Sequence, residues 1–359
     1  MNVVIRTDAS IEIGTGHVMR CLTLAKQLKR HGAEVTFVCR DFEGNSISYI
    51  REQGISVCSL PSIDVSASDI NWTKENWKLD AEKTVSVIKE LDVEVDLLIV
   101  DHYGLDSRWE SSVRNATKNI MVIDDLANRM HDCDLLLDQN YYLNMEGRYQ
   151  GLLPVHCVQM LGPNYILLRD EFVQVASKPR VRTGKIKNIL VFFGGTDPTG
   201  ETIKTLKAIK ELDIPEIRFN IVVGATNPRQ QEIEQLCNEM SNANYYYHIS
   251  NMAELMWEAD LAIGAGGATT WERCIMGLPA LVVVVADNQK VAAKALARQG
   301  ILICLGDYIQ VNSNDIKQKV LYLLKNPNIL EEISTSCKKI MDPTRINLYA
   351  TVDRVYKLK

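Results

Sequence analysis

Short apolar runs alternate with amphipathic stretches along most of the chain. In the first half, we predict strands at residues 3–5, 34–39, 56–60, 97–100, 119–123 and 135–137. The stretch 18–29 is predicted as a helix, because its apolar residues fall on one helical face (Val18, Leu22, Ala25, Leu28). Gly32 is placed to end that helix. Strands and helices that alternate in this way favour a parallel sheet covered by helices.

A second alternating series starts at Lys187. Its predicted strands are residues 189–193, 219–223, 245–248, 261–263, 280–285 and 301–305, with helices such as 251–259 and 269–276 between them. Residues 176–187 lack periodicity and are polar and basic, which indicates a linker. We therefore expect an N-terminal Rossmann-like domain at 1–175, a C-terminal one at 188–340, and a tail at 341–359. The helix of this tail is a candidate to pack back on the first domain.

The predicted fold class is α/β, with two doubly wound domains that face each other across a cleft. Ligands of such sheets bind beyond the carboxyl ends of the strands. Residues 62–82 are mainly polar, contain Trp72 and Trp77, and are expected to form an insertion or a long helix-bearing loop.

Length and charge restrict the class of protein. The chain has 359 residues, which suits two domains, and its net charge of −5 argues against a general nucleic-acid binder. The apolar run 281–286 is too short for a membrane span, and the chain enters a strand at once, without a signal peptide. The nine cysteines form no CxxC pair, which favours reduced thiols and a cytoplasmic location. We expect a small-molecule substrate and neither nucleic acid nor membrane as partner, and leave the oligomeric state open.

The loop Gly14-Thr15-Gly16-His17 connects the first strand to the first helix. Glycines allow close approach to a phosphate or a sugar, and His17 brings a titratable ring to the helix start. The alternative is a tight strand–helix turn capped by the histidine. The loop lacks the GxGxxG pattern, and the predicted strand 34–39 does not end in an acidic residue as a dinucleotide site requires.

Two glycine-rich turns follow strands of the second domain. Gly194-Gly195-Thr196 leads into a helix that Asp197 or Thr199 could cap, which is either an anion site or a plain turn. In the second turn, Gly266 and Gly267 precede Thr269, whose hydroxyl suits a phosphate. Glu272 suits the two hydroxyls of a ribose. The alternative for the second turn is an ordinary helix start with a Glu favoured by the helix dipole.

Three further polar segments follow predicted strands. Asp287-Asn288-Gln289 comes after the most apolar strand and is expected to face the cleft; a helix N-cap is the alternative for Asp287 alone. The segment 101–106, which includes Tyr103, is either a substrate-facing loop or a simple turn. Asp124 and Asp125, with His131, Cys133 and Asp134, match no metal-binding spacing, so we expect no metal and assign Asp125 to a turn cap. The absence of GxSxG and Walker A motifs argues against a serine hydrolase and a P-loop ATPase.

Residues 264–289 resemble the donor-sugar half of glycosyltransferases with two facing Rossmann-like domains (GT-B-like), such as the enzyme that adds N-acetylglucosamine in peptidoglycan synthesis. That resemblance implies that Glu272 holds the ribose of UDP and that the Ile249 backbone faces the uracil. The whole chain is similar to the PseG-type UDP-sugar hydrolases of pseudaminic acid biosynthesis and to related spore-coat polysaccharide proteins. The supporting stretches are 6–8, 14–20, 101–106, 123–129, 138–140, 161–172, 193–197 and 264–289.

This resemblance implies hydrolysis of UDP-2,4-diacetamido-2,4,6-trideoxy-β-L-altrose by attack of water at the anomeric carbon, with inversion and without metal or cofactor. It implies His17 as the base, with Tyr103 and Asn288 in the site. Asp8, Gly14 and Gly16 are assigned to the substrate, with the glycines making room for the sugar. UDP is a good leaving group, so one base suffices, without the carboxylate pair of glycosidases.

The exact sugar stays open, and two other functions remain. One is a UDP-sugar-dependent glycosyltransferase. The other is a non-catalytic nucleotide-sugar binding protein of spore-coat polysaccharide synthesis.

Overall fold

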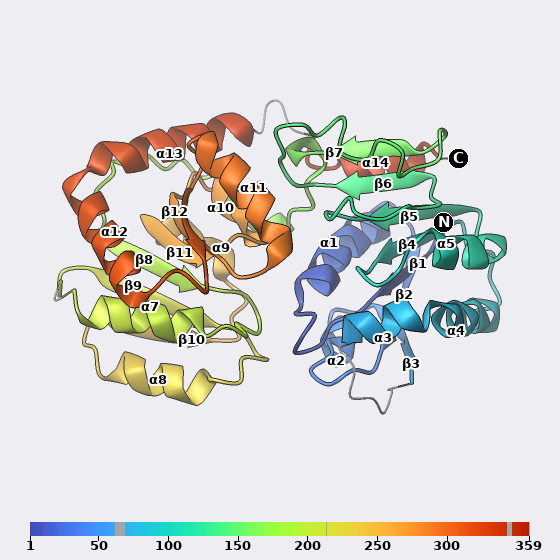
Figure 1. Cartoon of the computed structure of the whole chain (residues 1–359), viewed down its shortest axis with the longest axis horizontal. Helices are drawn as coiled ribbons and strands as arrows, with labels where there is room; N and C mark the ends of the chain where they lie inside the picture. The colour runs from blue at the N-terminus through green and yellow to red at the C-terminus, as the bar shows by residue number, and fades with distance from the viewer. Residues whose placement is uncertain (62–68, 213, 343–346, 359) are drawn as a thin grey trace. The chain divides into compact units, whose positions relative to one another are not determined.

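The computed structural model describes residues 1–61, 69–212, 214–342 and 347–358. These residues form two compact units, Met1–Leu167 with Asn347–Lys359, and Leu168–Ile346 (Figure 1). The division falls after Leu167, before the segment expected as the linker. Each unit has its own parallel sheet and its own core, as the two alternating series predict.

The described residues of the N-terminal unit form a seven-stranded parallel sheet in the order β3-β2-β1-β4-β5-β6-β7. The strands are β1 (Asn2–Thr7), β2 (Glu34–Arg40), β3 (Ser56–Leu60), β4 (Leu97–Asp101), β5 (Asn119–Ile123), β6 (Leu135–Asp138) and β7 (Val158–Leu161). The helices are α1 (Gly16–Arg30), α2 (Ile47–Glu52), α3 (Asp69–Glu75), α4 (Trp77–Glu90), α5 (Ser107–Val113) and α14 (Ala350–Tyr356). The strand order reverses between β1 and β4, which is where doubly wound sheets bind ligands.

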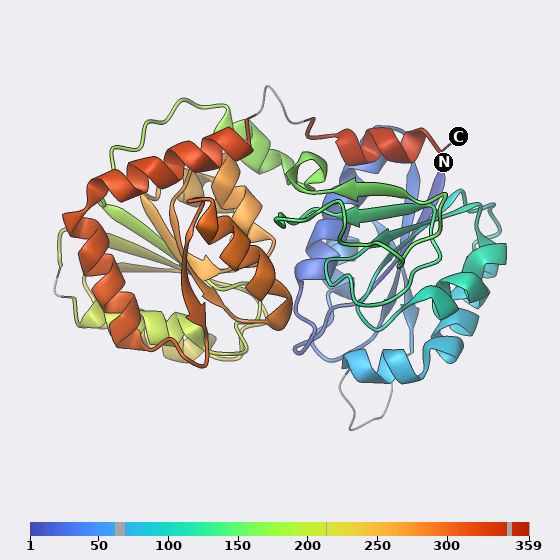
Figure 2. The ribbon, with the colours of Figure 1, turned by 45° about the horizontal axis from the view of Figure 1, so that its top comes forward.

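Helix α14 belongs to the N-terminal unit, although it ends the chain. Val352 and Val355 are buried in the same core as α1, and the Thr351 hydroxyl donates to the Tyr165 carbonyl at 2.9 Å. Figure 2 shows α14 lying against the unit that contains β1. The helix of the tail therefore packs on the N-terminal unit.

Helices α3 and α4 account for much of the expected insertion at 62–82, of which residues 62–68 lie outside the described residues. Asp80 of α4 is fully buried and accepts hydrogen bonds from Arg6 (Nη2, 2.7 Å) and Arg40 (Nη2, 2.5 Å). The Arg40 guanidinium also lies 4.8 Å from the centre of the Trp72 ring. Buried charges require such pairing, and here it fastens the two helices to the sheet.

The C-terminal unit has a six-stranded parallel sheet in the order β10-β9-β8-β11-β12-β13 among its described residues. The strands are β8 (Asn188–Phe192), β9 (Arg218–Val223), β10 (Ala243–Tyr247), β11 (Leu261–Ala265), β12 (Ala280–Val284) and β13 (Ile303–Asp307). The helices are α6 (Asp170–Ala176), α7 (Glu201–Lys210), α8 (Gln230–Asn238), α9 (Met252–Glu258), α10 (Thr269–Ile275), α11 (Asp287–Arg298), α12 (Ser313–Lys325) and α13 (Pro327–Ile340).

The basic segment 176–187 is anchored to the C-terminal unit. The Arg182 guanidinium is buried and donates to the carbonyls of Met256 (3.1 Å), Met276 and Ala259, which lie at the ends of α9 and α10. Burial lowers the pKa of Arg182 to about 9, and the neighbouring Arg180 adds to this effect. The segment therefore supplies the hydrogen bonds that two helix C-termini need.

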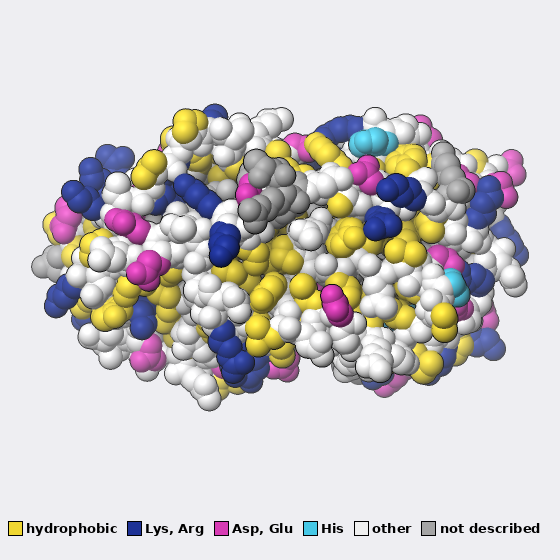
Figure 3. All heavy atoms as spheres, turned by 90° about the horizontal axis from the view of Figure 1, so that it is seen from above, with side chains coloured by type: hydrophobic (Ala, Val, Ile, Leu, Met, Phe, Trp, Pro, Cys, Tyr) yellow, Lys and Arg dark blue, Asp and Glu magenta, His cyan; other side chains and the backbone are white. Residues whose placement is uncertain are grey.

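Helices in the described part of the chain are too short or too polar to cross a membrane. On the face drawn in Figure 3, acidic and basic side chains are interspersed, and neither kind forms a continuous patch.

Candidate functional site

The first candidate site lies where β1 and β4 end in the N-terminal unit. Helix α1 starts shortly after β1 and places His17 and Arg20 three residues apart on one face. Both reach Asp101, the last residue of β4. The His17 Nδ1 atom lies 2.5 Å from Asp101 Oδ1, and Arg20 donates to both carboxylate oxygens (Nε–Oδ2 2.5 Å, Nη2–Oδ1 2.6 Å).

The Asp101 carboxylate determines how His17 can act. Burial alone would raise the pKa of Asp101, but Arg20 and His17 hold that pKa well below its usual range. An ionised Asp101 accepts the Nδ1 proton of His17, so that neutral His17 has its lone pair on Nε2. Arg20 Nη2 also lies 3.1 Å from Nδ1, but both groups are donors, and both bind the carboxylate. His17 is thus arranged to accept a proton at Nε2, as in a His–Asp pair.

Tyr103 completes this cluster. Its ring packs edge-on against His17, with 4.4 Å between ring centres, and its hydroxyl donates to Asp125 Oδ1 at 2.7 Å. Arg20 Nη1 donates to the other Asp125 oxygen at 3.1 Å. Burial and the Asp125 charge raise the pKa of Tyr103 well above its ordinary value, so the hydroxyl keeps its proton. The structure thus joins predicted His17 and Tyr103 to three residues outside the predicted site: Arg20, Asp101 and Asp125.

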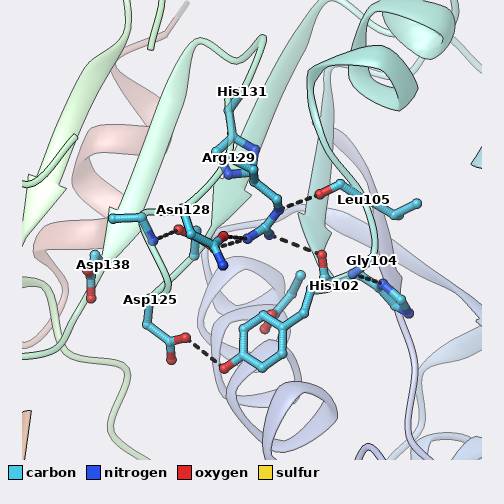
Figure 4. A network of polar contacts seen from close by, with 12 residues as sticks. His102, Gly104, Leu105, Asp125, Asn128, Arg129, His131 and Asp138 are labelled. Carbon is cyan, nitrogen blue, oxygen red and sulfur yellow. Dashed lines mark hydrogen bonds and ion pairs between the residues drawn. The ribbon is translucent and has the colours of Figure 1, made fainter. Parts of the chain in front are cut away.

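The assignment of Asp125 to a turn cap is wrong, because its neighbour caps the turn. Asp124 Oδ2 accepts from the Ala127 backbone at 2.8 Å, while Asp125 directs its carboxylate to Tyr103 (Figure 4). The sequence pattern alone does not tell which of two adjacent aspartates caps the turn. His131, also weighed as a metal ligand, lies 2.7 Å from Glu110. Among the described residues, no three His, Cys, Asp or Glu side chains are arranged to hold a metal ion.

Asp138, at the end of β6, lies in another group of polar side chains of the N-terminal unit. Its Oδ2 accepts from Arg148 Nε and from the Tyr149 hydroxyl, each at 3.0 Å. Burial and the nearby Asp125 charge raise the pKa of Asp138 to about 7, against the opposing effect of Arg148. The carboxyl therefore titrates near neutral pH within a crowded set of charges.

Asp8, predicted to bind substrate, is fully buried in a different ion-pair network. It accepts from Arg6 Nη1 at 2.6 Å and from the Arg40 backbone at 2.7 Å. His102 Nε2 lies 3.3 Å from its other oxygen. Burial opposes ionisation, but Arg6 and His102 keep the pKa of Asp8 far below its usual range. These contacts hold Asp8 within the end of the sheet, and its assignment to the substrate stays a prediction.

The loop 14–17 has the backbone that its glycines suggest. Gly14 has φ of +76°, a left-handed conformation that favours glycine, and its N–H donates to the Ser10 carbonyl at 2.9 Å. Gly16 begins α1, and a Cβ placed there would meet no described atom within 4 Å. Space next to Gly16 is consistent with its expected role of making room for a ligand.

The second candidate site lies at strand ends of the C-terminal unit. Gly194 (φ +97°), Gly195 and Thr196 form the turn after β8. A Cβ on Gly224 would collide with the Gly195 backbone, so the chain after β9 approaches this turn as closely as backbone allows. Asp197 caps α7 by accepting from the Glu201 and Thr202 backbones, each at 2.9 Å. Asp197 and Thr199 were the two predicted caps of this helix, and the hydrogen bonds show that Asp197 caps it.

The turns after β11 and β12 are joined by one predicted residue. Gln289 Oε1 accepts from the Gly266 backbone at 3.2 Å and from Val285 at 3.3 Å. Its contacts position the glycine turn. The other predicted residues lie at the same strand ends, with Thr269 and Asp287 beginning α10 and α11, Gly267 and Asn288 beside them, and Ile249 after β10.

Two arginines that the sequence analysis did not assign flank Glu272. Arg169 places Nε and Nη2 at 3.0 Å from Glu272 Oε1. Arg273 is buried and donates to the Ala265 carbonyl (2.7 Å) and to Thr270 Oγ1 (3.0 Å), while forming no ion pair with a carboxylate among the described residues. Burial lowers the pKa of Arg273. The hydrogen bond to Ala265 places this guanidinium at the end of β11, next to the glycine turn.

Solved structures with the same architecture decide the fold. The MurG structure of Acinetobacter baumannii matches 99% of this chain and 98% of its own, with a TM-score of 0.63 and 18% identity. The fold is GT-B-like. Residues 189–342 match the family model described as "Glycosyltransferase family 28 C-terminal domain".

Relatives in sequence extend through both units. The "UDP-2,4-diacetamido-2,4,6-trideoxy-beta-L-altropyranose hydrolase" of Campylobacter jejuni is 29% identical over 302 residues, covering 84% of this chain and 97% of the relative. The "Spore coat polysaccharide biosynthesis protein SpsG" of Bacillus subtilis is 26% identical, covering 85% of this chain and 84% of its own. The chain therefore has a GT-B-like fold, its residues 189–342 are similar to the family 28 C-terminal domain, and its sequence is similar to these two proteins.

Proposed function

We propose that this protein is a UDP-sugar hydrolase that releases UDP by attack of water at the anomeric carbon. The proposed substrate is UDP-2,4-diacetamido-2,4,6-trideoxy-β-L-altrose, the sugar nucleotide in the name of the C. jejuni relative. The observation that carries the proposal is the His17–Asp101 pair with Arg20 behind it, because this arrangement is suited to a general base.

The C-terminal unit supplies the nucleotide site in this proposal. The backbone N–H groups of the turns at Gly194–Thr196 and Gly266–Thr269 bind the diphosphate, and Arg273, which donates to the last carbonyl of β11, adds positive charge. Glu272 binds the ribose, and the Ile249 backbone faces the uracil. The match of residues 189–342 to the family 28 domain supports this assignment.

The proposed reaction needs one proton acceptor. His17 Nε2 takes a proton from water as the water oxygen bonds to the anomeric carbon, and the bond between that carbon and the diphosphate oxygen breaks. The electron pair leaves with UDP, whose charge the C-terminal turns stabilise. Asp101 stabilises the imidazolium that forms, and Arg20 keeps Asp101 ionised. Tyr103, held by Asp125, contacts the sugar.

A glycosyltransferase is the second candidate, because residues 189–342 match the model of a glycosyltransferase domain. It would transfer the sugar to an added acceptor and release little free sugar to water. A non-catalytic binding protein would bind the UDP-sugar and release no UDP. The His17–Asp101 pair is unnecessary for binding alone and therefore favours catalysis.

Isotope labelling tests the mechanism. The protein is incubated with the proposed UDP-sugar in ¹⁸O water, and the products are analysed by mass spectrometry. We expect ¹⁸O in the sugar, because water attacks carbon, whereas label in UDP would show attack at phosphorus and contradict the mechanism. In a parallel assay His17→Ala should keep its affinity for UDP and lose about 10²–10⁴-fold in turnover. Full activity of this variant would exclude His17 as the base.

A further inference from the structure

Glu272 and Arg169 form an asymmetric ion pair within the C-terminal unit. Arg169 Nε and Nη2 both lie 3.0 Å from the same carboxylate oxygen, Glu272 Oε1. The second oxygen, Oε2, is buried and accepts no hydrogen bond from any residue that the structure describes. The usual arginine–carboxylate pair is bidentate and uses both oxygens. Here one oxygen is fixed and the other is left for a further donor.

The Arg169 guanidinium is itself held in place. It stacks 4.6 Å from the centre of the Phe172 ring, which is fully buried, and its Nη1 lies 2.8 Å from Glu171 Oε1. Arg169 stands at the N-terminal end of α6, so both supports come from the following helical turn. A side chain held on two sides loses little further freedom when it binds Glu272, and it can therefore fix the direction of the carboxylate.

We infer that Arg169 is a positioning residue that holds Glu272 Oε1 and so presents Oε2 to a hydroxyl of the nucleotide's ribose. This inference rests on the proposed function, in which Glu272 binds the ribose. A buried carboxylate oxygen without a donor is costly to leave unpaired, and a ribose hydroxyl supplies the missing hydrogen bond. Arg169 thereby contributes to selection of ribonucleotides without touching the nucleotide.

Titration calorimetry with UDP and 2′,3′-dideoxy-UDP tests the inference, since only UDP carries the ribose hydroxyls. We expect the wild-type protein to bind UDP about 10–100-fold more tightly than the dideoxy nucleotide, as for a hydrogen bond to a charged group. Glu272→Ala should abolish most of this preference. Arg169→Ala should reduce it at least about 5-fold while leaving affinity for dideoxy-UDP within about 2-fold. The double variant should behave like Glu272→Ala, because the two residues act as one unit.

Two further variants control for structure. Arg169→Lys retains charge without the planar fork and should restore part of the preference for UDP. Arg218→Ala removes an exposed arginine at the start of β9, away from the strand carboxyl ends, and should leave both affinities unchanged. Retained binding of dideoxy-UDP by Arg169→Ala shows that the variant is folded.

The outcomes separate this inference from the proposed function. Equal weakening of both nucleotides by Arg169→Ala would mean that Arg169 contacts the phosphates or only supports the fold, and would overturn the inference. Unchanged affinities would overturn it as well. Failure of the wild-type protein to bind either nucleotide would instead overturn the proposed UDP site, and the inference with it.

Discussion

The two units have different kinds of residues at the carboxyl ends of their parallel sheets. In the N-terminal unit, the strand ends carry charged side chains that bind one another, with Arg20 between Asp101 and Asp125. In the C-terminal unit, the strand ends are glycine turns whose backbones come close together, as at Gly195 and Gly224. Paired side chains can fix a proton acceptor, whereas backbone N–H groups can surround an anion. In the proposed function, this difference corresponds to proton transfer in the N-terminal unit and nucleotide binding in the C-terminal unit.

The largest expected effect comes from removing the charge that orients His17. Asp101→Asn keeps the size of the side chain, but its amide can no longer hold both His17 and Arg20 as a carboxylate does. We expect kcat to fall about 10²–10⁴-fold, as when a general base is lost. The affinity for UDP should change little, because the nucleotide is assigned to the other unit. Steady-state kinetics and calorimetry with UDP measure the two quantities.

Asp125→Asn is the matched control for this variant. It removes a second carboxylate bound by Arg20 but leaves the His17–Asp101 contact in place. Its kcat should therefore fall less than that of Asp101→Asn. Equal losses in the two variants would show that the whole charged cluster acts together, and would reject a specific role for Asp101. Circular dichroism of both variants checks that Arg20, left with fewer partners, has not destabilised the unit.

The second effect tests the backbone turns of the C-terminal unit. In Gly224→Ala the new methyl group would collide with the Gly195 backbone, so the turn after β8 must move. We expect a loss of about 1–3 kcal/mol in unfolding free energy, typical of overpacking, together with weaker UDP binding. Urea unfolding and calorimetry measure these changes.

Gly16→Ala is the corresponding change in the N-terminal unit. Its methyl group meets no described atom within 4 Å, so unfolding free energy should stay near that of the wild type. If Gly16 makes room for the sugar, KM should nevertheless rise.

A Gly224→Ala protein that binds UDP as tightly as the wild type would contradict the assignment of the diphosphate to the backbone turns.

Patterns along the chain were sufficient to predict most strands, and with them the loops that carry His17 and Tyr103. These two residues follow β1 and β4, which are neighbours in the sheet, so their proximity follows from topology. The exception is β7, which was not predicted because Val158 and Gln159 are exposed and the strand shows no apolar run. Local pattern was enough where a residue's place depends on its own strand.

Residues whose role depends on distant partners could not be predicted in this way. Asp101 ends one apolar strand and Asp8 follows another, but Asp101 binds His17 whereas Asp8 is buried with Arg6. Arg182 has the sequence context of a solvated linker, yet it is buried against helix ends far along the chain. Arg169 and Glu272 are likewise joined only by the fold. Such pairs are set by tertiary contacts, which periodicity does not record.

The smallest expected effect concerns the dense charge of the N-terminal unit. Burial and the Asp125 charge raise the pKa of Asp138 to about 7 in the folded protein, whereas an unfolded aspartate titrates near pH 4. Between these values the folded state holds the proton more tightly. The stability that Asp138 contributes is therefore present at low pH and is lost as pH rises to about 7. Unlike this carboxyl, the asparagine of Asp138→Asn does not titrate.

Urea unfolding of the wild type and Asp138→Asn at pH 5 and pH 8 measures this contribution. The wild type should lose on the order of 2 kcal/mol relative to the variant between these pH values, so the substitution should cost more at pH 5 than at pH 8. Asp96→Asn is the control, because a hydrogen bond from Lys118 lowers the pKa of Asp96, which therefore stays ionised at both pH values. An equal cost of Asp138→Asn at both pH values would show that Arg148 outweighs burial and Asp125. Arg148 would then compensate the charge of Asp138 in the folded protein, and ionisation of this carboxyl would not lower the stability of the N-terminal unit.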